Sequence, residues 1–327
     1  MKAAWYERVG QPHDVLQVGE LDTPAPRHGE LCIQVHASGV NPSDANRRRG
    51  EKWPRLSGPI IPHCDGAGVV VAAGAGVSED WVGRRVWTNI ADGYRQNGTA
   101  AQSVCLPLDN VAPLPDNTSY NEGACLGVPA MTAHCCLFSN GSVAGKDILV
   151  TGGAGAVGHY AIQLAKWAGA RVIATVSSDE KAAVADEAGA DLTLNYRMID
   201  VARAVKDFTN GIGVDRIVDV DFGGNLETLF GAIRTGGVIA TYASRTEETP
   251  NLPVYPAMML SLTTKFVLLP TTPGALRSRA KSDIVRWLET GRSIHRIARE
   301  FTLEEIADCH TFVEAKSKIG CAIVVLP

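Results

Sequence analysis

Three glycines near the middle of the chain have the spacing of a phosphate-binding turn. Gly153, Gly155 and Gly158 form the pattern G-x-G-x-x-G directly after the apolar run 148–150. Such glycines let the backbone turn tightly, approach a pyrophosphate and pack a helix against a sheet. The helix predicted after the turn would present unpaired amides and the positive end of its dipole to an anion. We therefore expect a dinucleotide to be bound by the backbone of Gly152, Gly153, Gly155, Ala156, Val157 and Gly158.

The residues around the turn predict the elements that position it. An apolar stripe at helical spacing runs from Val157 to Ala168, and a second apolar run, 171–176, follows this helix. The alternation then continues, with strands predicted near 148–151, 171–176, 191–194, 215–219, 237–242 and 265–269. Strands that alternate with helices predict an α/β fold with a doubly wound parallel sheet.

The end of the second strand distinguishes between two dinucleotides. Val176 stands where an NAD-binding unit usually has Asp or Glu. Ser177, Ser178 and Lys181 follow, and their hydroxyls and ammonium group could hold a 2′-phosphate, which favours NADPH. Ser177 and Glu180 also fit the capping box S-x-x-E of a helix that starts there, and both interpretations can hold together.

Length and charge limit the function classes. The 327 residues, 45% of them hydrophobic, indicate a globular protein of about two domains. A net charge of −4 favours neither nucleic acid nor a membrane surface as partner. No run approaches the ~18 apolar residues of a spanning helix, and the N-terminus lacks a secretory apolar region. We expect a cytoplasmic protein whose partner is a small molecule.

Two residue groups have alternative interpretations. The run Arg47 to Arg49 could attract an anionic or CoA-linked substrate, or it could be a solvated loop face. The eight cysteines show no C-x-x-C spacing, so we expect buried thiols rather than disulfides or a zinc knuckle.

The chain ends indicate a second domain. The first ~120 residues are β-rich, with predicted strands at 2–6, 31–37 and 68–72 separated by Pro and Gly clusters. After residue 270, helices predicted at 275–289 and 303–314 and a strand at 322–326 do not extend the strand–helix alternation. We therefore expect one domain from residues 1–124 and 271–327, and a dinucleotide-binding domain from residues 125–270.

Four segments together resemble a known family. They are Gly-Val-Asn-Pro-Ser-Asp at 39–44, Ile-Pro-His-Cys-Asp-Gly-Ala-Gly-Val-Val at 61–70, Gly-Val-Pro-Ala-Met-Thr-Ala at 127–133, and the glycine turn. The chain resembles the zinc-free quinone oxidoreductases, the zeta-crystallin-like branch of the medium-chain dehydrogenase/reductase superfamily. The resemblance implies a GroES-like catalytic domain, a Rossmann domain, a homodimer and hydride transfer from NADPH.

The resemblance also implies roles for individual residues. Asn41 and Thr132 would lie near the nicotinamide, and Ser177, Lys181 and Tyr196 near the 2′-phosphate. We add Asp44 to Asn41 as a catalytic candidate, and Tyr242 to the residues of the cofactor site.

Zinc enzymes of this superfamily use Cys, His and a third ligand. Here Asn41 stands at the first ligand position and Cys64 at the histidine position, with His63 beside it and Cys125 near the third. Because Asn is a poor zinc ligand, we expect no metal and assign Cys64 to the substrate pocket. A zinc alcohol dehydrogenase stays an alternative, since His63, Cys64 and Cys125 are all present.

Without a metal, nothing stabilises the alkoxide that forms from a plain alcohol. A quinone, or an alkene conjugated to a carbonyl, accepts hydride at carbon and spreads the charge into oxygen. We expect quinone reduction, with reduction of activated alkenes as the alternative. Trp53 and Tyr94 are candidates for the pocket wall, or they could equally anchor loops. A non-catalytic NADPH-binding protein, crystallin-like or RNA-binding, is the other class, although a pI of about 6.1 gives it little support.

Overall fold

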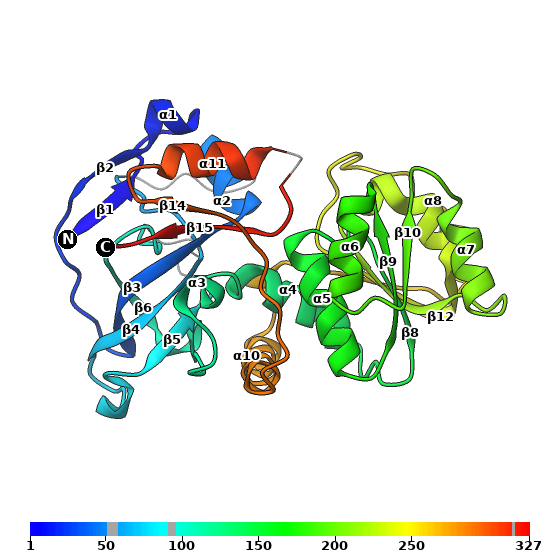
Figure 1. Cartoon of the computed structure of the whole chain (residues 1–327), viewed down its shortest axis with the longest axis horizontal. Coiled ribbons are helices and arrows are strands. Elements are labelled where there is room, and N and C mark those ends of the chain that lie inside the picture. Colours follow the sequence, from blue (N-terminus) through cyan, green and yellow to red (C-terminus); the bar gives the residue numbers. More distant parts are fainter. Residues whose placement is uncertain (51–57, 91–95, 316–317) are drawn as a thin grey trace. The chain divides into compact units, whose positions relative to one another are not determined.

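The computed structural model describes residues 1–50, 58–90, 96–315 and 318–327 (Figure 1). These residues separate into two compact units. Unit 1 comprises residues 1–128 and 281–327, and unit 2 comprises residues 129–280.

Unit 1 is built on a mixed β-sheet whose strands come from both ends of the chain. In spatial order the sheet contains β14 (Ile297–Thr302), β15 (Cys321–Val325), β3 (Glu30–Val40), β4 (Asp65–Ala73), β5 (Arg85–Thr88) and β7 (Val111–Pro113), and β6 (Ser103–Pro107) also pairs with β3. A separate antiparallel pair joins β1 (Lys2–Trp5) and β2 (Gln17–Glu20). The α-helices of this part are α1 (Pro12–Val15), α2 (Pro42–Arg49), α3 (Tyr120–Gly123) and α11 (Ile306–Glu314), with 3-10 helices at Glu79–Trp81 and Leu108–Asn110.

The core of unit 1 lies on one face of β3. Leu31 and Ile33 are fully buried there, because alternate residues of a strand point to the same face. They pack in one cluster with Val104 and Leu106 of β6 and with Cys309 of α11. Helix α11 and the N-terminal strands therefore share one core, although they are far apart in sequence.

Unit 2 contains the predicted parallel sheet. Its spatial order is β10 (Leu192–Asn195), β9 (Arg171–Val176), β8 (Asp147–Val150), β11 (Val214–Asp219), β12 (Ile233–Thr241) and β13 (Thr263–Phe266). The order runs outward from β8 in both directions, so the topology switches between β8 and β11, where ligands of such sheets bind. This arrangement confirms the predicted α/β class.

Helices cover both faces of this sheet. Figure 1 shows α5 (Ala156–Trp167) and α6 (Asp179–Glu187) on one face, and α7 (Val201–Phe208) and α8 (Phe222–Ala232) on the other. The remaining α-helices are α4 (Gly127–Phe138), α9 (Val254–Met259) and α10 (Gly274–Glu289), and Leu269–Thr271 is a 3-10 helix. The strand expected at 265–269 is thus wrong at its end, because β13 (Thr263–Phe266) ends earlier and Pro270 lies in the first turn of the 3-10 helix.

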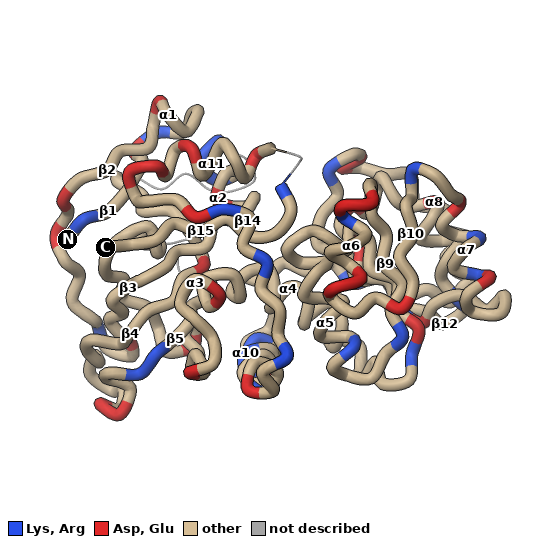
Figure 2. Tube along the Cα trace, viewed as in Figure 1, with Lys and Arg blue, Asp and Glu red and all other residues tan. Residues whose placement is uncertain are grey.

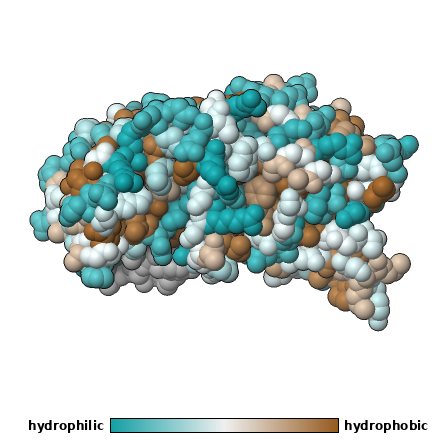
Figure 3. All heavy atoms as spheres, turned by 90° about the horizontal axis from the view of Figure 1, so that it is seen from below, coloured by the Kyte–Doolittle hydropathy of each residue, from teal (hydrophilic) through white to brown (hydrophobic). Residues whose placement is uncertain are grey.

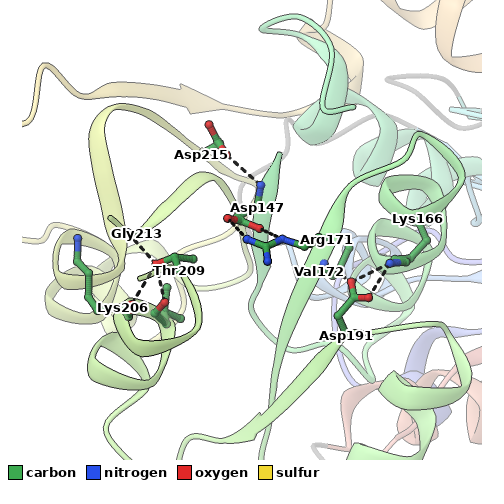
Figure 4. A network of polar contacts seen from close by, with 10 residues as sticks. Asp147, Lys166, Arg171, Val172, Asp191, Lys206, Thr209, Gly213 and Asp215 are labelled. Carbon is green, nitrogen blue, oxygen red and sulfur yellow. Dashed lines mark hydrogen bonds and ion pairs between the residues drawn. The ribbon is translucent and has the colours of Figure 1, made fainter. Parts of the chain in front are cut away.

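Charged side chains connect the strands at the amino-terminal edge of the sheet (Figure 4). The guanidinium group of Arg171 donates to both carboxylate oxygens of Asp147, at 2.6 and 2.7 Å. The amide of Asp147 donates to Asp215 over 2.9 Å, and Lys166 pairs with Asp191 over 2.8 Å. The edge opposite the glycine turn is therefore closed by protein contacts.

Charges of both signs are spread over each unit. Figure 2 shows Lys and Arg interspersed with Asp and Glu along the traces of both units, without a continuous basic stripe on the described residues. None of the described helices is long and apolar enough to cross a bilayer.

Candidate functional site

The glycine turn connects β8 to α5 at the carboxyl edge of the unit 2 sheet. Gly152 has φ +67°, a left-handed conformation that favours glycine. The amide of Gly153 donates to the carbonyl of Thr175 in β9 over 2.9 Å, which ties the turn to the neighbouring strand. Gly155 is the exposed N-cap residue of α5, followed by Ala156 and Val157. The first amides of α5 therefore point out of an accessible helix end.

The three glycines of the motif serve different purposes. A Cβ on Gly158 would lie 2.3 Å from the carbonyl oxygen of Gly152, and one on Gly153 would lie 2.9 Å from the Cβ of Ala174. These two glycines permit close packing of the helix on the strands. A Cβ on Gly155 would meet only the oxygen of Gly152, at 3.3 Å, so the space in front of the helix end is open.

A buried carboxylate holds the turn from the other side. Asp219, at the end of β11, is fully buried. Its Oδ1 accepts from the hydroxyl of Thr151 and the amide group of Asn225, both at 2.8 Å, and its Oδ2 accepts from the amide of Asp221 at 3.1 Å. Burial raises the pKa of Asp219, although these hydrogen bonds act against the shift. Sequence reasoning missed Asp219; its signal was an acid at the end of a strand, directly after the apolar residues 217–218.

The strand next to Asp219 contributes a predicted cofactor residue. The amide of Tyr242, directly after β12, donates to the carbonyl of Asp219 over 3.2 Å. The structure therefore places Tyr242 at the same sheet edge as the glycine turn.

The end of β9 gathers the groups expected to hold a 2′-phosphate. Lys181 Nζ donates to Ser177 Oγ over 3.1 Å. Tyr196 is half exposed, and its amide donates to the carbonyl of Val176 over 3.1 Å. An ammonium group, a serine hydroxyl and an exposed phenol ring thus lie at the ends of two neighbouring strands.

The predicted capping box of α6 is wrong by one residue. The N-cap is Ser178, whose Oγ accepts from the amide of Lys181 over 3.4 Å, because Ser178 has the extended backbone of a cap residue. Ser177 is therefore not used as the cap, and its hydroxyl contacts the Lys181 side chain.

In unit 1, Asn41 links two acidic residues. Asn41 is buried at the start of α2, and its backbone amide donates to Asp44 Oδ2 over 2.6 Å. Its side-chain Nδ2 donates to Asp65 Oδ2 over 2.7 Å. Asp44 therefore shapes the first turn of α2, while Asp65 orients the Asn41 side chain.

Asp65 also anchors the start of α4. Both of its carboxylate oxygens lie 2.8 Å from the amide of Val128. A Cβ on Gly127 would lie 2.1 Å from Asp65 Oδ1, so only glycine fits. The same helix carries the buried Thr132. The sequence gave no independent signal for Asp65 as the common partner of Asn41 and α4.

A chain of buried side chains starts beside Asp65. Thr99 Oγ1 donates to the Asp65 carbonyl over 2.5 Å, and Ser38 Oγ lies 2.7 Å from Thr99 Oγ1. Ser38 Oγ is also 2.8 Å from His63 Nδ1, and His63 Nε2 is 3.0 Å from His310 Nε2. Each hydroxyl has one hydrogen, so Ser38 donates to Thr99, His63 Nδ1–H donates to Ser38, and His310 Nε2–H donates to His63.

Burial keeps this histidine pair neutral. It lowers the pKa of His63 to about 3, and burial, together with the nearby His63 and Arg48, lowers the pKa of His310 well below its usual value. His63 also has φ +80°, which is uncommon for a residue with a side chain.

The groups at the zinc-ligand positions have other partners. Both ring nitrogens of His63 are used by Ser38 and His310, and the Cys125 thiol contacts the carbonyl of Asn121 at 3.4 Å. Cys64 is half-buried. Over the described parts of the chain, no three His, Cys, Asp or Glu side chains gather as a possible metal site. The donor set does not fit an open tetrahedral zinc site.

Neither expectation for the arginine run holds at its second and third members. Arg48 is fully buried in α2, and its guanidinium group donates to Glu314 and to the carbonyl of Gly10. Arg49 pairs with Glu314 at 2.9 Å and with Asn46 at 2.7 Å. These two arginines bind protein groups and are neither a solvated face nor a free anion site. Trp53 and Tyr94 lie outside the described residues.

Models of two protein families match the chain. The alcohol dehydrogenase GroES-like domain matches residues 27–116, and the zinc-binding dehydrogenase family matches residues 156–285. These matches confirm the expected GroES-like and Rossmann parts of the fold.

Several curated proteins are similar to the chain. A quinone oxidoreductase of Pongo abelii is 30% identical over 75% of the chain and 74% of its own length. An alcohol dehydrogenase of Geobacillus stearothermophilus is 30% identical over 79% and 82%. A 2-haloacrylate reductase of a Burkholderia species is 28% identical over 100% and 99%.

Solved structures are similar over the full length. An NAD-dependent alcohol dehydrogenase superposes with a TM-score of 0.90 at 30% identity, covering 100% of both chains. A mycobacterial protein complexed with NADPH has a TM-score of 0.86 at 27% identity, covering 99% of this chain and 100% of the other.

Proposed function

The chain belongs to the quinone oxidoreductase branch of the medium-chain dehydrogenase/reductase superfamily, and from this premise we propose that it is an NADPH-dependent, zinc-independent reductase of quinones. The observation that carries the proposal is the Asn41–Asp65 hydrogen bond of 2.7 Å. An amide committed to a carboxylate stands where zinc enzymes of the superfamily have their first ligand. We also propose that unit 1 corresponds to the GroES-like domain and unit 2 to the Rossmann domain.

The residues of unit 2 fit NADPH. The open helix end at Gly155 suits the pyrophosphate, and the Lys181–Ser177 pair suits a 2′-phosphate. β9 ends at Val176, where a carboxylate would repel that phosphate. The bound cofactor supplies hydride, while these side chains fix its register. The similar structure that contains NADPH supports this assignment.

The side chains of unit 1 favour a quinone as the acceptor of the hydride. Hydride addition to a quinone puts the charge on an oxygen, which a hydrogen-bond donor or water can satisfy without a metal. Oxidation of a plain alcohol requires a group that stabilises an alkoxide, and His63 and Cys125 are turned to other partners. Asn41 would hold the nicotinamide or the acceptor carbonyl in position.

A second candidate is the reduction of an activated alkene. The similarity to a 2-haloacrylate reductase over the whole chain favours it. Both reactions transfer hydride to an electron-poor carbon, so they differ only in how the acceptor is held.

One assay separates these candidates. Oxidation of NADPH is followed with 1,4-benzoquinone, 9,10-phenanthrenequinone and a 2-alkenal, and alcohol oxidation with NADP⁺ is followed with and without a chelator. We expect turnover of at least one quinone that the chelator does not change. Turnover of the alkenal alone would select the alternative. Inactivity toward all acceptors at saturating NADPH would exclude a reductase, and chelator-sensitive alcohol oxidation would favour a zinc enzyme.

We further propose a cytoplasmic homodimer. On the face shown in Figure 3, apolar residues form separate groups among hydrophilic ones. The edge strand β13 and the preceding helix α9 carry strongly exposed apolar side chains, namely Tyr255, Met258, Met259 and Phe266. An unpaired strand edge beside exposed apolar residues suits pairing with a second copy of the chain.

A further inference from the structure

Two cysteines lie opposite each other on neighbouring strands of unit 1. Strand β3 pairs with β6 in antiparallel register, and Cys32 is the direct partner of Cys105. In the same register, the amide of Val35 donates to the carbonyl of Gln102 over 2.9 Å. Hydrogen-bonded and non-hydrogen-bonded pairs alternate along such a ladder. Cys32 is three residues from Val35, so Cys32 and Cys105 form a non-hydrogen-bonded pair.

The hydrogen bond at the other end of the β3–β6 pairing also makes Cys32 and Cys105 a non-hydrogen-bonded pair. The amide of Leu108 donates to the carbonyl of Gly29 over 3.1 Å, and these residues are again three positions from the cysteines. In a non-hydrogen-bonded pair the Cα atoms are about 4.5 Å apart and the side chains approach closely. A disulfide requires Cα atoms about 4.4–6.8 Å apart. The two cysteines therefore meet the distance requirement without a movement of the strands.

The pair lies on the sheet face away from the core. Leu31 and Ile33, the neighbours of Cys32, are fully buried in the core cluster. Cys32 Sγ is 4.0 Å from the carbonyl of Pro24, which belongs to a segment whose residues are mostly exposed. Cys105 is half-buried. Cys32 itself is buried, with an exposed fraction of 5%, so a small oxidant reaches the pair from the side of the half-buried Cys105.

The two thiols differ in acidity. A hydrogen bond from Cys105 lowers the pKa of Cys32, against the opposite effect of burial. The same hydrogen bond, with burial, raises the pKa of Cys105. Cys32 is thus the thiol that ionises first and attacks an electrophile.

We propose that Cys32 and Cys105 are a dithiol site that a hydroperoxide oxidises to a cross-strand disulfide. The Cys32 thiolate attacks the terminal oxygen of the hydroperoxide, which breaks the O–O bond and, with one proton, releases an alcohol or water. The Cys105 thiol then attacks the sulfenic sulfur of Cys32, the S–S bond forms, and water leaves. Two thiols and one hydroperoxide give one disulfide, one water and the alcohol, and a dithiol reductant reverses the change.

A second cysteine pair provides the internal comparison. Cys125 and Cys321 are also hydrogen-bonded to each other. Both are buried, with exposed fractions of 1% and 7%, and no strand register joins them. They should stay reduced under conditions that oxidise Cys32 and Cys105, because no strand pairing holds their Cα atoms at a bridging distance.

The site is tested on the full-length protein with hydrogen peroxide as the probe. After a brief treatment at one to a few equivalents, free thiols are blocked with N-ethylmaleimide, and a digest prepared without reductant is analysed by mass spectrometry. We expect one linked peptide pair, containing Cys32 and Cys105, that dithiothreitol separates. The thermal unfolding midpoint should rise by about 5 °C on oxidation, because the bridge closes a long loop of the unfolded chain.

Three variants complete the experiment. Cys32→Ser and Cys105→Ser should each abolish the linked peptide, and Cys125→Ser should leave it unchanged. Quantitative labelling of both Cys32 and Cys105 after peroxide would overturn the proposal. A bridge that forms only in denaturant, or that joins other cysteines, would also overturn it. The readout is covalent and does not depend on which acceptor the enzyme reduces.

Discussion

The side-chain nitrogen of Asn41 lies 2.7 Å from a carboxylate oxygen of Asp65, and this contact decides which atom of the amide faces the acid. A carboxylate accepts hydrogen bonds but does not donate them, so the NH₂ group must face Asp65. The side-chain carbonyl oxygen of Asn41 therefore faces away from Asp65.

The first prediction tests this orientation. Asn41→Asp places two carboxylates at hydrogen-bond distance, where both cannot be ionised. We expect kcat/KM to fall about 100-fold at neutral pH, because the acceptor is lost from its fixed position. Asn46→Asp is the matched control on the same helix, since Asn46 already accepts from Arg49. Full activity of Asn41→Asp would contradict the assigned role.

The second prediction concerns the choice of cofactor. Lys181→Ala should raise the KM for NADPH about 10-fold and leave the KM for NADH nearly unchanged, because only NADPH has the 2′-phosphate that Lys181 would bind. Lys166→Ala is the control, since Lys166 pairs with Asp191 at the other edge of the sheet. An equal rise of KM for NADPH and NADH would contradict the assignment of Lys181 to the 2′-phosphate site.

The third prediction concerns the support of the glycine turn. Asp219→Asn replaces one acceptor oxygen by an NH₂ group, so a donor such as Thr151 or Asp221 loses its partner. We expect the Kd for NADPH, from a fluorescence titration, to rise about 10-fold as the turn loosens. Asp215→Asn, at the other end of the same strand, should leave the Kd within about twofold. An unchanged Kd of Asp219→Asn for NADPH would show that Asp219 contributes to packing and not to cofactor binding.

The fourth prediction is a pH dependence of stability. The pKa of His63 is lowered to about 3 by burial, and that of His310 is lowered well below its usual value. Between pH ~6.5 and ~3 the unfolded chain binds protons that the native pair does not, so stability falls as the pH falls. His310→Gln keeps a donor for His63 but binds no proton. Its unfolding midpoint should drop less between pH 7 and pH 5 than that of the wild type.

The control for this comparison is His13→Gln, because His13 lies on the surface beside Asp308. It should keep the wild-type drop with pH. If His310→Gln and the wild type lose stability in parallel, the buried pair is not the source of the pH dependence.

The fifth prediction concerns the homodimer. Met259→Asp places a charge on the exposed apolar surface beside β13, and we expect it to convert the protein to monomers in analytical ultracentrifugation. Met198→Asp changes an equally prominent methionine after β10, at the opposite edge of the sheet, and should stay dimeric. A dimeric Met259→Asp protein would place the contact elsewhere.

The centre of the parallel sheet was predictable because β8, β9 and β11 are buried on both faces. Continuous apolar runs at 148–151 and 171–176 agree with β8 and β9 within one residue. Strand β14 (Ile297–Thr302) was not predicted, because only Phe301 of its residues is buried. Helix α2 was not predicted, since three successive arginines give no apolar periodicity, and the partner of Arg48, Glu314, is far away in sequence.

The candidate site also has a part that the sequence could predict and a part that it could not. The glycine turn and the Ser177–Lys181 pair lie within short segments, so spacing alone could indicate them. The roles of Asp65 and of the His63–His310 pair depend on contacts between distant segments, and the two histidines are 247 residues apart. No local sequence pattern predicts a contact between residues so far apart in the chain.

The position of β15 has a consequence for how the protein is made. Unit 2 is continuous, from residue 129 to 280, whereas the sheet of unit 1 needs β15 between β14 and β3. During translation, unit 2 is complete before β15 exists, although domains usually fold in N-terminal order. Until β15 emerges from the ribosome, residues 37–40 of β3 lack their antiparallel partner on one side, while β4 pairs with residues 37–39 on the other. The nascent chain therefore carries an open strand edge for most of its synthesis, the stage at which a chaperone that covers strand edges would act.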